Sequence, residues 1–560
     1  MRFTIEEVSS AASQKYRQFR PVDLPDRQWP SRVIEKAPIW VSVDLRDGNQ
    51  ALTRPMDVHE KLQMFTLLVR LGFKEIEVGF PSASQPEFDF IRMLIEQKLI
   101  PPDVWIQVLT QAREHLIRRT FESLVGCERA IVHLYNSTST VQRRVVFRMS
   151  QDEIAGLAVS GTKLVKELTS KVGDTQIRYE YSPESFTGTE LEFSKRICED
   201  VMSVWEPTAE APIVLNLPAT VELATPNVYA DQIEWMSRNL ADRDKAIISV
   251  HTHNDRGSAV AAAELAQMAG AERVEGTLFG YGERTGNVDL VTLALNLYTQ
   301  GIEPGLDLSR LDEISQTVRL CTEEPLHPRH PYSGELVFTA FSGSHQDAIS
   351  KGMAEWNADP SNLWDVPYIA IDPKDIGRDY TTIIRVNSQS GKGGAAYLLR
   401  EYAGFEIPRQ MQPEFGQVIQ RVAERTGSEL SPAMIAQEFD REYLEPYAPY
   451  ELVMHEEQQL DGEVACHAVI SVDLHERPVG GKGNGPIDAF VSALQNLVSF
   501  DLISFQEHSM GSGADCKAAA YVYCQKDGRG AWGAAVDENA TTATMMAILV
   551  SVNKLSATTE

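Results

Sequence analysis

The chain has 560 residues, of which 43% are hydrophobic and 23% charged, and its formal net charge is −27 at pH 7. The length predicts a soluble globular protein with several domains, and no apolar run reaches the roughly 20 residues that a membrane helix needs. The negative charge argues against nucleic acid or anionic lipid as a general partner.

Residues 1–35 precede the first regular pattern and are predicted to form an N-terminal arm. They lack the apolar core of a secretory signal. The six cysteines of the chain are scattered without CxxC spacing. Cysteines of this kind are typical of a reduced protein, so we expect a cytoplasmic location.

From about residue 39, short β-rich runs alternate with longer segments, such as 60–73 and 152–173, whose apolar residues have helical spacing. Eight such pairs are typical of a (β/α)8 TIM barrel, which we predict over residues 36–330. A doubly wound open sheet fits less well, because no GxGxxG follows the first strand. The predicted strands lie at 39–48, 75–80, 104–111, 129–137, 177–185, 212–220, 246–255 and 273–282.

His251 and His253 lie two residues apart at the end of the apolar run AIISV. Residues i and i+2 of a strand point the same way, so the two imidazoles leave the strand end side by side. Strand ends gather at one face of a barrel, and strands one and seven both adjoin strand eight. Asp47, after the first strand, is therefore expected near both histidines. Each residue alone is more often structural, but their coincidence favours a divalent metal site.

Four motifs fall in register on the barrel elements: DLRDGNQAL (44–52), GFKEIEVGFPSAS (72–84), HTHNDRG (251–257) and GYGERTGN (280–287). Together they resemble the long bacterial form of the 2-isopropylmalate synthase family, whose members are metal-dependent barrel enzymes. The resemblance implies an acyltransferase that condenses acetyl-CoA with 2-oxoisovalerate (3-methyl-2-oxobutanoate), giving 2-isopropylmalate and CoA, the first step toward leucine. A synthase for another 2-oxo acid, giving citramalate or homocitrate, is the alternative.

The resemblance also implies roles for single residues. Asp47, His251 and His253 are the implied metal ligands, with Asn287 beside them, and the ion is magnesium, manganese or zinc. Arg46 is expected to stabilise negative oxygen on the enolate of acetyl-CoA or on the new alkoxide. The implied pocket residues are His133, Ser182 and Thr220 for the oxo acid, together with Glu184 as a catalytic residue.

A connector is predicted over residues 331–435, with a glycine-rich hinge at Gly391–Gly394. Its first part, 331–353, reads as helical and carries His345. In the family this helix can reach the active site of the partner subunit, which implies a homodimer. We predict His345 as the base or proton relay for the acetyl methyl group, assisted by Tyr368. A surface histidine on an interface helix is the other interpretation.

Residues 436–560 are predicted to form a small α+β domain, reading strand, turn, helix, two strands, then strand and closing helix. The family uses this domain to bind leucine as an inhibitor. The turn GKGNGP (481–486), with Gly483 and Gly485, resembles the family's glycine-rich turn, which leaves room for a free amino acid. Asp488 departs from the small neutral residue expected there. A domain used for assembly only is the alternative.

Three other protein classes share some of these features. A lyase of the same superfamily can run such chemistry backward. Metal hydrolases of the amidohydrolase type usually carry HxH on the first strand, whereas here it lies on the seventh. A non-catalytic amino-acid sensor would not need Arg46 beside Asp47. No nucleic-acid or membrane partner is expected.

Overall fold

The computed structural model describes residues 15–16, 18–340, 342–359, 363–378, 392–426, 430–445, 448–460, 462–511 and 516–557. The chain forms two compact units. The first comprises residues 1–337 with 375–377, and the second comprises residues 338–374 with 378–560. Across the described residues, no helix combines the length and the apolar character needed to span a membrane.

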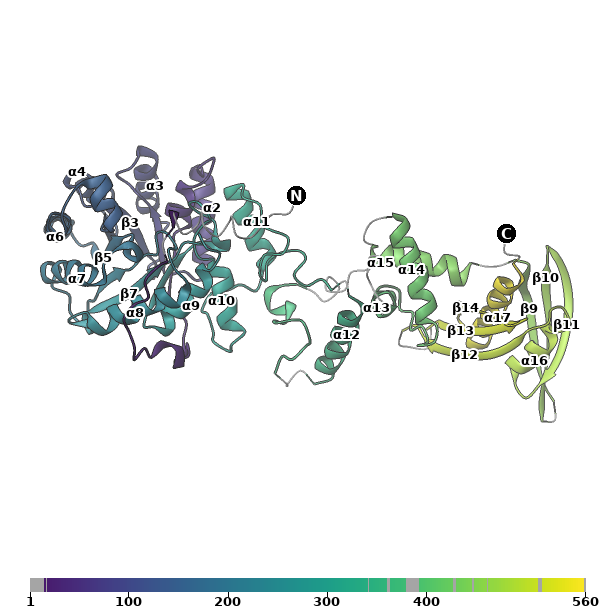
Figure 1. The fold of residues 1–560 in the computed structure, drawn as a ribbon. Helices are drawn as coiled ribbons and strands as arrows, with labels where there is room; N and C mark the ends of the chain where they lie inside the picture. The colour runs from purple at the N-terminus through teal and green to yellow at the C-terminus, as the bar shows by residue number, and fades with distance from the viewer. Residues whose placement is uncertain are drawn as a thin grey trace. The chain divides into compact units, whose positions relative to one another are not determined.

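The first unit is a closed barrel of eight parallel strands in sequential order (Figure 1). The prediction of a TIM barrel is therefore confirmed, and every predicted strand is present. Closure is made by β1 and β8, which pair in parallel from Ile39 with Arg273 to Ser42 with Gly276. The strands are β1 (Ile39–Ser42), β2 (Glu75–Gly79), β3 (Trp105–Gln111), β4 (Arg129–Ser137), β5 (Gln176–Glu184), β6 (Ile213–Asn216), β7 (Ala246–His251) and β8 (Arg273–Gly276).

Helix α2 (Val58–Leu71) illustrates how the sequence forms the helices around the barrel. Asp57 and Glu60 make a capping box at its start, and Gly72 ends it in the left-handed conformation with φ 106°. Met64 and Leu68, one helical turn apart, are buried. The other helices of this unit are α3 (Gln85–Glu96), α4 (Glu114–Ser123), α5 (Thr140–Gln142), α6 (Gln151–Thr169), α7 (Leu191–Trp205), α8 (Pro226–Asn239), α9 (Ala259–Met268), α10 (Leu290–Tyr298) and α11 (Leu311–Thr322).

Asp44 is a buried carboxyl group just after β1. It lies 2.6 Å from the Ser42 hydroxyl and accepts a hydrogen bond from the Leu278 amide. Burial raises its pKa to about 7. An aspartate in the unfolded chain ionises near pH 4, so between about pH 4 and 7 the folded state binds more protons. The contribution of Asp44 to stability is therefore largest at low pH and falls as the pH rises through this window.

Asp44→Asn should remove the loss of folding stability that Asp44 causes as the pH rises. Relative to the wild type, the variant should gain stability between about pH 4.5 and 7.5, by up to about 4 kcal/mol, because one pKa unit corresponds to about 1.36 kcal/mol. Urea unfolding of both proteins at the two pH values measures the difference. A difference between variant and wild type that does not change with pH contradicts the assignment of a protonated Asp44.

The second unit begins with a helical region: α12 (Gly343–Ala358), α13 (Lys392–Ala403), α14 (Gln412–Thr426) and α15 (Pro432–Phe439). Two expectations are corrected here. The helix predicted over 331–353 starts only at Gly343, because turns occupy residues 331–338. The predicted hinge is largely helix α13, since Gly394 packs so closely on α12 that a Cβ there would lie 2.1 Å from Gln346 Oε1. Gly391 lies outside the described residues.

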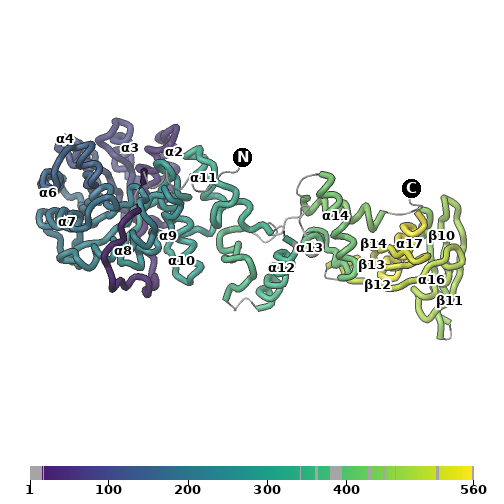
Figure 2. The backbone as a smooth tube through the Cα atoms, in the orientation of Figure 1, coloured from purple at the N-terminus to yellow at the C-terminus, as the bar shows by residue number. Residues whose placement is uncertain are grey.

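The C-terminal part repeats a β-β-β-α unit (Figure 2). The first consists of β9 (Tyr450–Leu460), β10 (Glu463–Val472), β11 (His475–Gly483) and α16 (Pro486–Leu494). The second consists of β12 (Asp501–Ser509), β13 (Ala518–Lys526), β14 (Arg529–Asp537) and α17 (Ala540–Ser556). Both sheets are antiparallel. Helices and strands share one core, which includes Phe490, Val522 and Ile548. The α+β class is confirmed, but β9 was not predicted, and β11 replaces the predicted turn.

Glycines set the close approach of helix to strand in both repeats. A Cβ on Gly481 would lie 2.3 Å from the backbone nitrogen of Ala493 in α16. A Cβ on Gly533 would lie 2.4 Å from the backbone oxygen of Ala547 in α17. These contacts with helix backbone exclude any larger residue at the two positions without a shift of the helix.

Candidate active site

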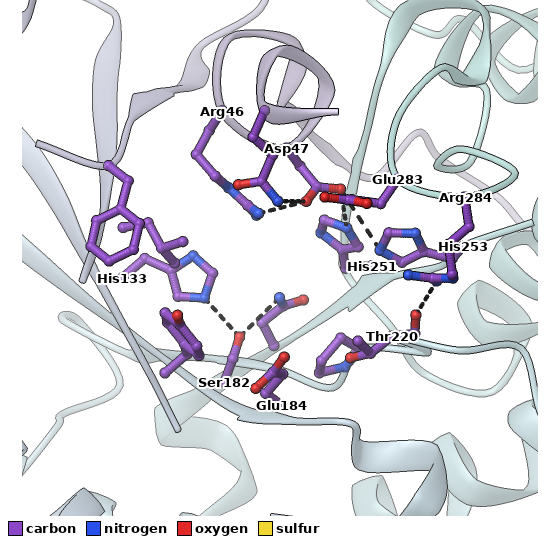
Figure 3. Close-up of a pocket in the computed structure, with 16 residues that line it drawn as sticks. Arg46, Asp47, His133, Ser182, Glu184, Thr220, His251, His253, Glu283 and Arg284 are labelled. Atoms are coloured by element: carbon purple, nitrogen blue, oxygen red, sulfur yellow. Dashed lines mark hydrogen bonds and ion pairs between the residues drawn. The ribbon is translucent and has the colours of Figure 1, made fainter. Parts of the chain in front are cut away.

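A cavity of about 310 Å³ lies at the C-terminal ends of the barrel strands (Figure 3). It brings together eight of the residues singled out from the sequence: Arg46, Asp47, His133, Ser182, Glu184, Thr220, His251 and His253. The carboxyl ends of barrel strands are where TIM-barrel active sites form. The gathering of these side chains in one cavity therefore makes it the candidate active site.

Asp47, His251 and His253 converge at one side of this cavity. Asp47 Oδ2 lies 3.5 Å from His251 Nε2 and 3.7 Å from His253 Nε2. Among the described residues, Asp47 Oδ2 and His253 Nδ1 are buried polar atoms without a hydrogen-bond partner. Unpartnered buried acceptors are costly unless a ligand satisfies them. One carboxylate and two imidazoles in this arrangement fit a divalent metal ion.

The charges of the three groups suit this assignment. Burial raises the pKa of Asp47, but Arg46 and the two imidazoles outweigh burial and hold it well below its usual range. Burial and the neighbouring His251 lower the pKa of His253 to about 3. Burial also lowers the pKa of His251, but Asp47 and Glu275 raise it to about 9. Near neutral pH the site thus offers a carboxylate, one neutral imidazole and one imidazole that must release a proton to a metal.

Asn287 lies beside the metal-site histidines without lining the cavity itself. It forms an isolated antiparallel bridge with His253, and its Oδ1 atom is buried without a partner in the described structure. The loop that carries it depends on glycine: a Cβ on Gly286, where φ is 90°, would lie 1.9 Å from the carbonyl oxygen of Gly280. The tight GYGERTGN loop therefore fixes Asn287 next to the metal site.

Arg46 is held from two sides. Its Nε atom donates to Glu77 at 2.5 Å, and its Nη1 atom donates to Asp47 at 2.7 Å. The side chain is 10% exposed, so a mostly buried positive charge faces the cavity next to the metal-site carboxylate. A guanidinium fixed by two carboxylates keeps its orientation while the remaining donors face the cavity.

Hydrogen bonds orient the remaining predicted pocket residues. His133 Nε2 lies 2.7 Å from the Ser182 hydroxyl, and His133 Nδ1 lies 2.8 Å from Glu77. The Ser137 hydroxyl donates to Glu184. Thr220 Oγ1 accepts the backbone amide of Ser185 at 2.9 Å.

His345 and Tyr368 belong to the second unit, where their rings stack with centroids 3.9 Å apart. Both side chains are exposed, and Tyr368 has a positive φ of 66°. A non-glycine residue in this conformation is uncommon and marks a position worth functional attention. The two residues predicted to act together in proton transfer are thus direct neighbours.

The amino-acid sequence was compared with known proteins. The HMGL-like family model matches residues 37–318, the model of the α-isopropylmalate synthase post-catalytic domain matches residues 335–400, and the LeuA allosteric (dimerisation) domain matches residues 429–556. The 2-isopropylmalate synthase of Rhodospirillum rubrum is 54% identical over 97% of this chain and 99% of its own. That of Clostridium acetobutylicum is 51% identical over 96% of this chain and 99% of its own.

The chain belongs to the 2-isopropylmalate synthase family. The resemblance carried by the four sequence motifs is confirmed, and with it the assignment to the acyltransferase type of enzyme. The match of the HMGL-like model also supports a metal-dependent barrel, in agreement with the buried cluster of Asp47, His251 and His253.

Several residues that line the cavity were not predicted from the sequence. Tyr135 and Asn216 line it together with Leu109, and so do Glu283 and Arg284, two residues of the GYGERTGN motif to which no role was assigned. Tyr135 follows His133 by two residues on β4 and faces the same cavity, so strand alternation could have found it. Asn216 ends β6 within an apolar run, where only the barrel topology reveals that it faces the pocket.

Proposed function

We propose that the protein condenses acetyl-CoA with 2-oxoisovalerate and water, giving 2-isopropylmalate and CoA. The observation that carries the proposal is the juxtaposition, in one cavity, of a carboxylate–imidazole metal site with the fixed guanidinium of Arg46. High identity to curated 2-isopropylmalate synthases over nearly the whole chain supports it. Relatives that act on other 2-oxo acids are distinguished by the assay described below.

In this proposal Asp47, His251, His253 and Asn287 hold a divalent ion, either magnesium, manganese or zinc. When bound, the ion polarises the ketone of the oxo acid as a Lewis acid. The His133–Ser182 pair and Thr220 orient the oxo acid, and they lie in the cavity that contains the metal-site residues.

Arg46 stabilises negative charge during the reaction. Carbon–carbon bond formation turns the acetyl enolate and the ketone into an alkoxide, and water then cleaves the thioester to release CoA. The donors of Arg46 that face the cavity are prealigned by Glu77 and Asp47, so little reorganisation is needed as charge develops. Glu184, whose carboxylate lies in the same cavity, is proposed to handle a proton in these steps.

His345 is proposed to remove the proton of the acetyl methyl group, and Tyr368 is proposed to assist it. The stacked pair is exposed on its unit and therefore accessible to a second subunit. We propose that the protein is a homodimer in which this pair serves the active site of the partner, and the match to a dimerisation domain supports this. We also propose a cytoplasmic location, since all six cysteines are free.

We propose four functional parts: an N-terminal arm (1–35), a catalytic barrel (36–330), a connector (331–435) and a regulatory domain (436–560). Leucine is proposed to bind the regulatory domain at Gly483 and Gly485 and to inhibit the enzyme. No proposed catalytic residue lies in that domain, so leucine acts by shifting a conformational equilibrium.

Gly485→Asp should relieve inhibition by leucine while leaving kcat within about twofold of the wild type. A Cβ at Gly485 meets no atom within 4 Å and φ is −163°, so aspartate fits without strain and places a charge between β11 and α16. Gly483 is less suitable, because a Cβ there would lie 2.5 Å from the backbone of α16. Activity is titrated with leucine, and binding is followed by calorimetry. If leucine neither binds nor inhibits the wild type, the regulatory assignment is wrong.

The experiment that tests the proposed function measures CoA release from acetyl-CoA with a panel of 2-oxo acids and divalent metals. The highest kcat/KM is expected with 2-oxoisovalerate, and no release is expected after chelation of the metal. A preference for pyruvate or 2-oxoglutarate would overturn the assigned substrate but keep the reaction type. No CoA release with any 2-oxo acid would overturn the synthase proposal itself.

A further inference from the structure

Glu275 is a fully buried carboxylate on β8, beneath the metal site and outside the residues that line the cavity. Its Oε2 atom lies 2.9 Å from His251 Nδ1 and accepts from Asn216 Nδ2 at 3.1 Å. Its Oε1 atom accepts from Arg273 at 2.8 Å and from Gln107 at 3.0 Å. Each oxygen thus has two partners inside the barrel.

These contacts define which ring nitrogen of His251 is available to bind a metal. The Arg273 guanidinium and the two side-chain amides can only donate at these contacts, so Glu275 acts as an acceptor on both oxygens. A carboxylate acceptor at Nδ1 keeps the proton on that nitrogen and leaves Nε2, the atom 3.5 Å from Asp47 Oδ2, for a metal. Glu275, which selects the tautomer of His251, therefore lies in the barrel interior.

The same carboxylate lies in a continuous ring of contacts. Asn216 Nδ2 joins Glu275 to the Ser182 hydroxyl at 3.0 Å. From Ser182 the contacts pass through His133 and Glu77 to Arg46, and from Arg46 to Asp47. His251 closes the ring, because its Nδ1 atom contacts Glu275 and its Nε2 atom lies 3.5 Å from Asp47 Oδ2. Substrate-pocket residues and metal-site residues are thus oriented by one hydrogen-bonded structure in which Glu275 contacts both groups.

We propose that Glu275 is a positioning residue of the metal site, which fixes the tautomer and orientation of His251 and so sets the affinity for the metal. The inference rests on the metal site of the proposed function. A carboxylate that orients an imidazole ligand typically contributes 10- to 100-fold in metal affinity. Arg273 has a supporting role, because its buried guanidinium joins Glu275 to Glu75 and Glu180.

Glu275→Gln tests the proposal. Glutamine has nearly the same shape but offers one acceptor and one donor, while His251, Asn216, Arg273 and Gln107 all donate to Glu275. Either His251 and Asn216 or Arg273 and Gln107 then face an amide NH2 group. Calorimetric titration of Mn²⁺ into the metal-free full-length protein should give a Kd raised by about 10- to 100-fold.

Glu75→Gln is the matched control. Glu75 is also buried and accepts from the same Arg273 at 2.7 Å, but among the described residues it contacts no proposed metal ligand. Both variants remove one buried negative charge next to Arg273 and should lower the thermal midpoint. Only Glu275→Gln should raise the Kd for Mn²⁺. Equal losses of Mn²⁺ affinity in the two variants would show a general effect of charge and overturn the proposal.

If Glu275→Gln does not fold, Glu275→Asp provides the second test. Aspartate keeps the charge that Arg273 needs, but its shorter side chain withdraws the carboxylate from His251, so Mn²⁺ affinity should again fall, and Glu75→Asp should keep it. Wild-type affinity in a folded Glu275 variant overturns this inference alone. Absence of stoichiometric Mn²⁺ binding by the wild type would instead overturn the metal site of the proposed function.

Discussion

His253→Ala should abolish stoichiometric binding of a divalent metal and lower turnover by at least about 1000-fold, because polarisation of the ketone contributes several kcal/mol of transition-state stabilisation. The substitution removes one of three groups that face a common point, and His253 Nε2 lies only 3.7 Å from Asp47 Oδ2. Metal content is measured by elemental analysis after dialysis, and turnover by CoA release.

The variant should stay folded. His253 Nδ1 has no hydrogen-bond partner in the described structure, so removing the imidazole leaves no broken hydrogen bond at that atom. His115→Ala is the control, since His115 is exposed on helix α4 and should leave metal content and turnover unchanged. A folded His253→Ala protein that retains one metal ion per chain would show that the ligands have been assigned wrongly.

Arg46→Lys should lower kcat by roughly 100- to 1000-fold, the effect of losing one aligned donor to a developing oxyanion. Lysine can pair with Glu77 or with Asp47, but its ammonium group cannot reproduce the two anchored directions of the guanidinium. If the interaction is made only in the transition state, kcat and kcat/KM fall together while KM changes little. Steady-state kinetics with 2-oxoisovalerate varied at saturating metal and acetyl-CoA provides this comparison.

Arg27→Lys is a matched control for this substitution. Arg27 also makes two hydrogen bonds to one carboxylate, that of Asp231, at 2.8 and 3.0 Å, but it does not line the active-site cavity. It should alter stability slightly and leave kcat unchanged. Near-normal kcat in Arg46→Lys would restrict Arg46 to a structural role. Loss of bound metal in Arg46→Lys would show that it acts through Asp47.

The barrel and the metal-site cluster could be predicted because their signals are local. Period-two alternation places His251 and His253 on the same side of a strand, and the rule that strands end at one face brings Asp47 to them. Strands β1, β6 and β7 are mostly buried, apolar runs, and such runs between segments of helical periodicity are readily recognised.

The interior network of the barrel could not be predicted in the same way. Glu275 and Arg273 lie two residues apart on β8, and this spacing alone does not reveal their partners. Their partners, such as Glu75 and Gln107, come from strands whose contacts exist only in the closed barrel. Strand β9 was missed for another reason: its residues are mostly exposed and include several glutamates and glutamines, so they carry neither apolar alternation nor high β-propensity.

The proposed metal site spans the seam at which the barrel closes. Strand β8 pairs with β1 on one side and with β7 on the other. Asp47 follows β1 and His251 ends β7, so a bound ion ties the first strand of the barrel to the seventh across the eighth. A ligand specific for the closed state stabilises it by about 4 kcal/mol at a free concentration 1,000 times Kd. If the proposed ligands hold the ion, chelation should first increase proteolysis at the β1–β8 seam.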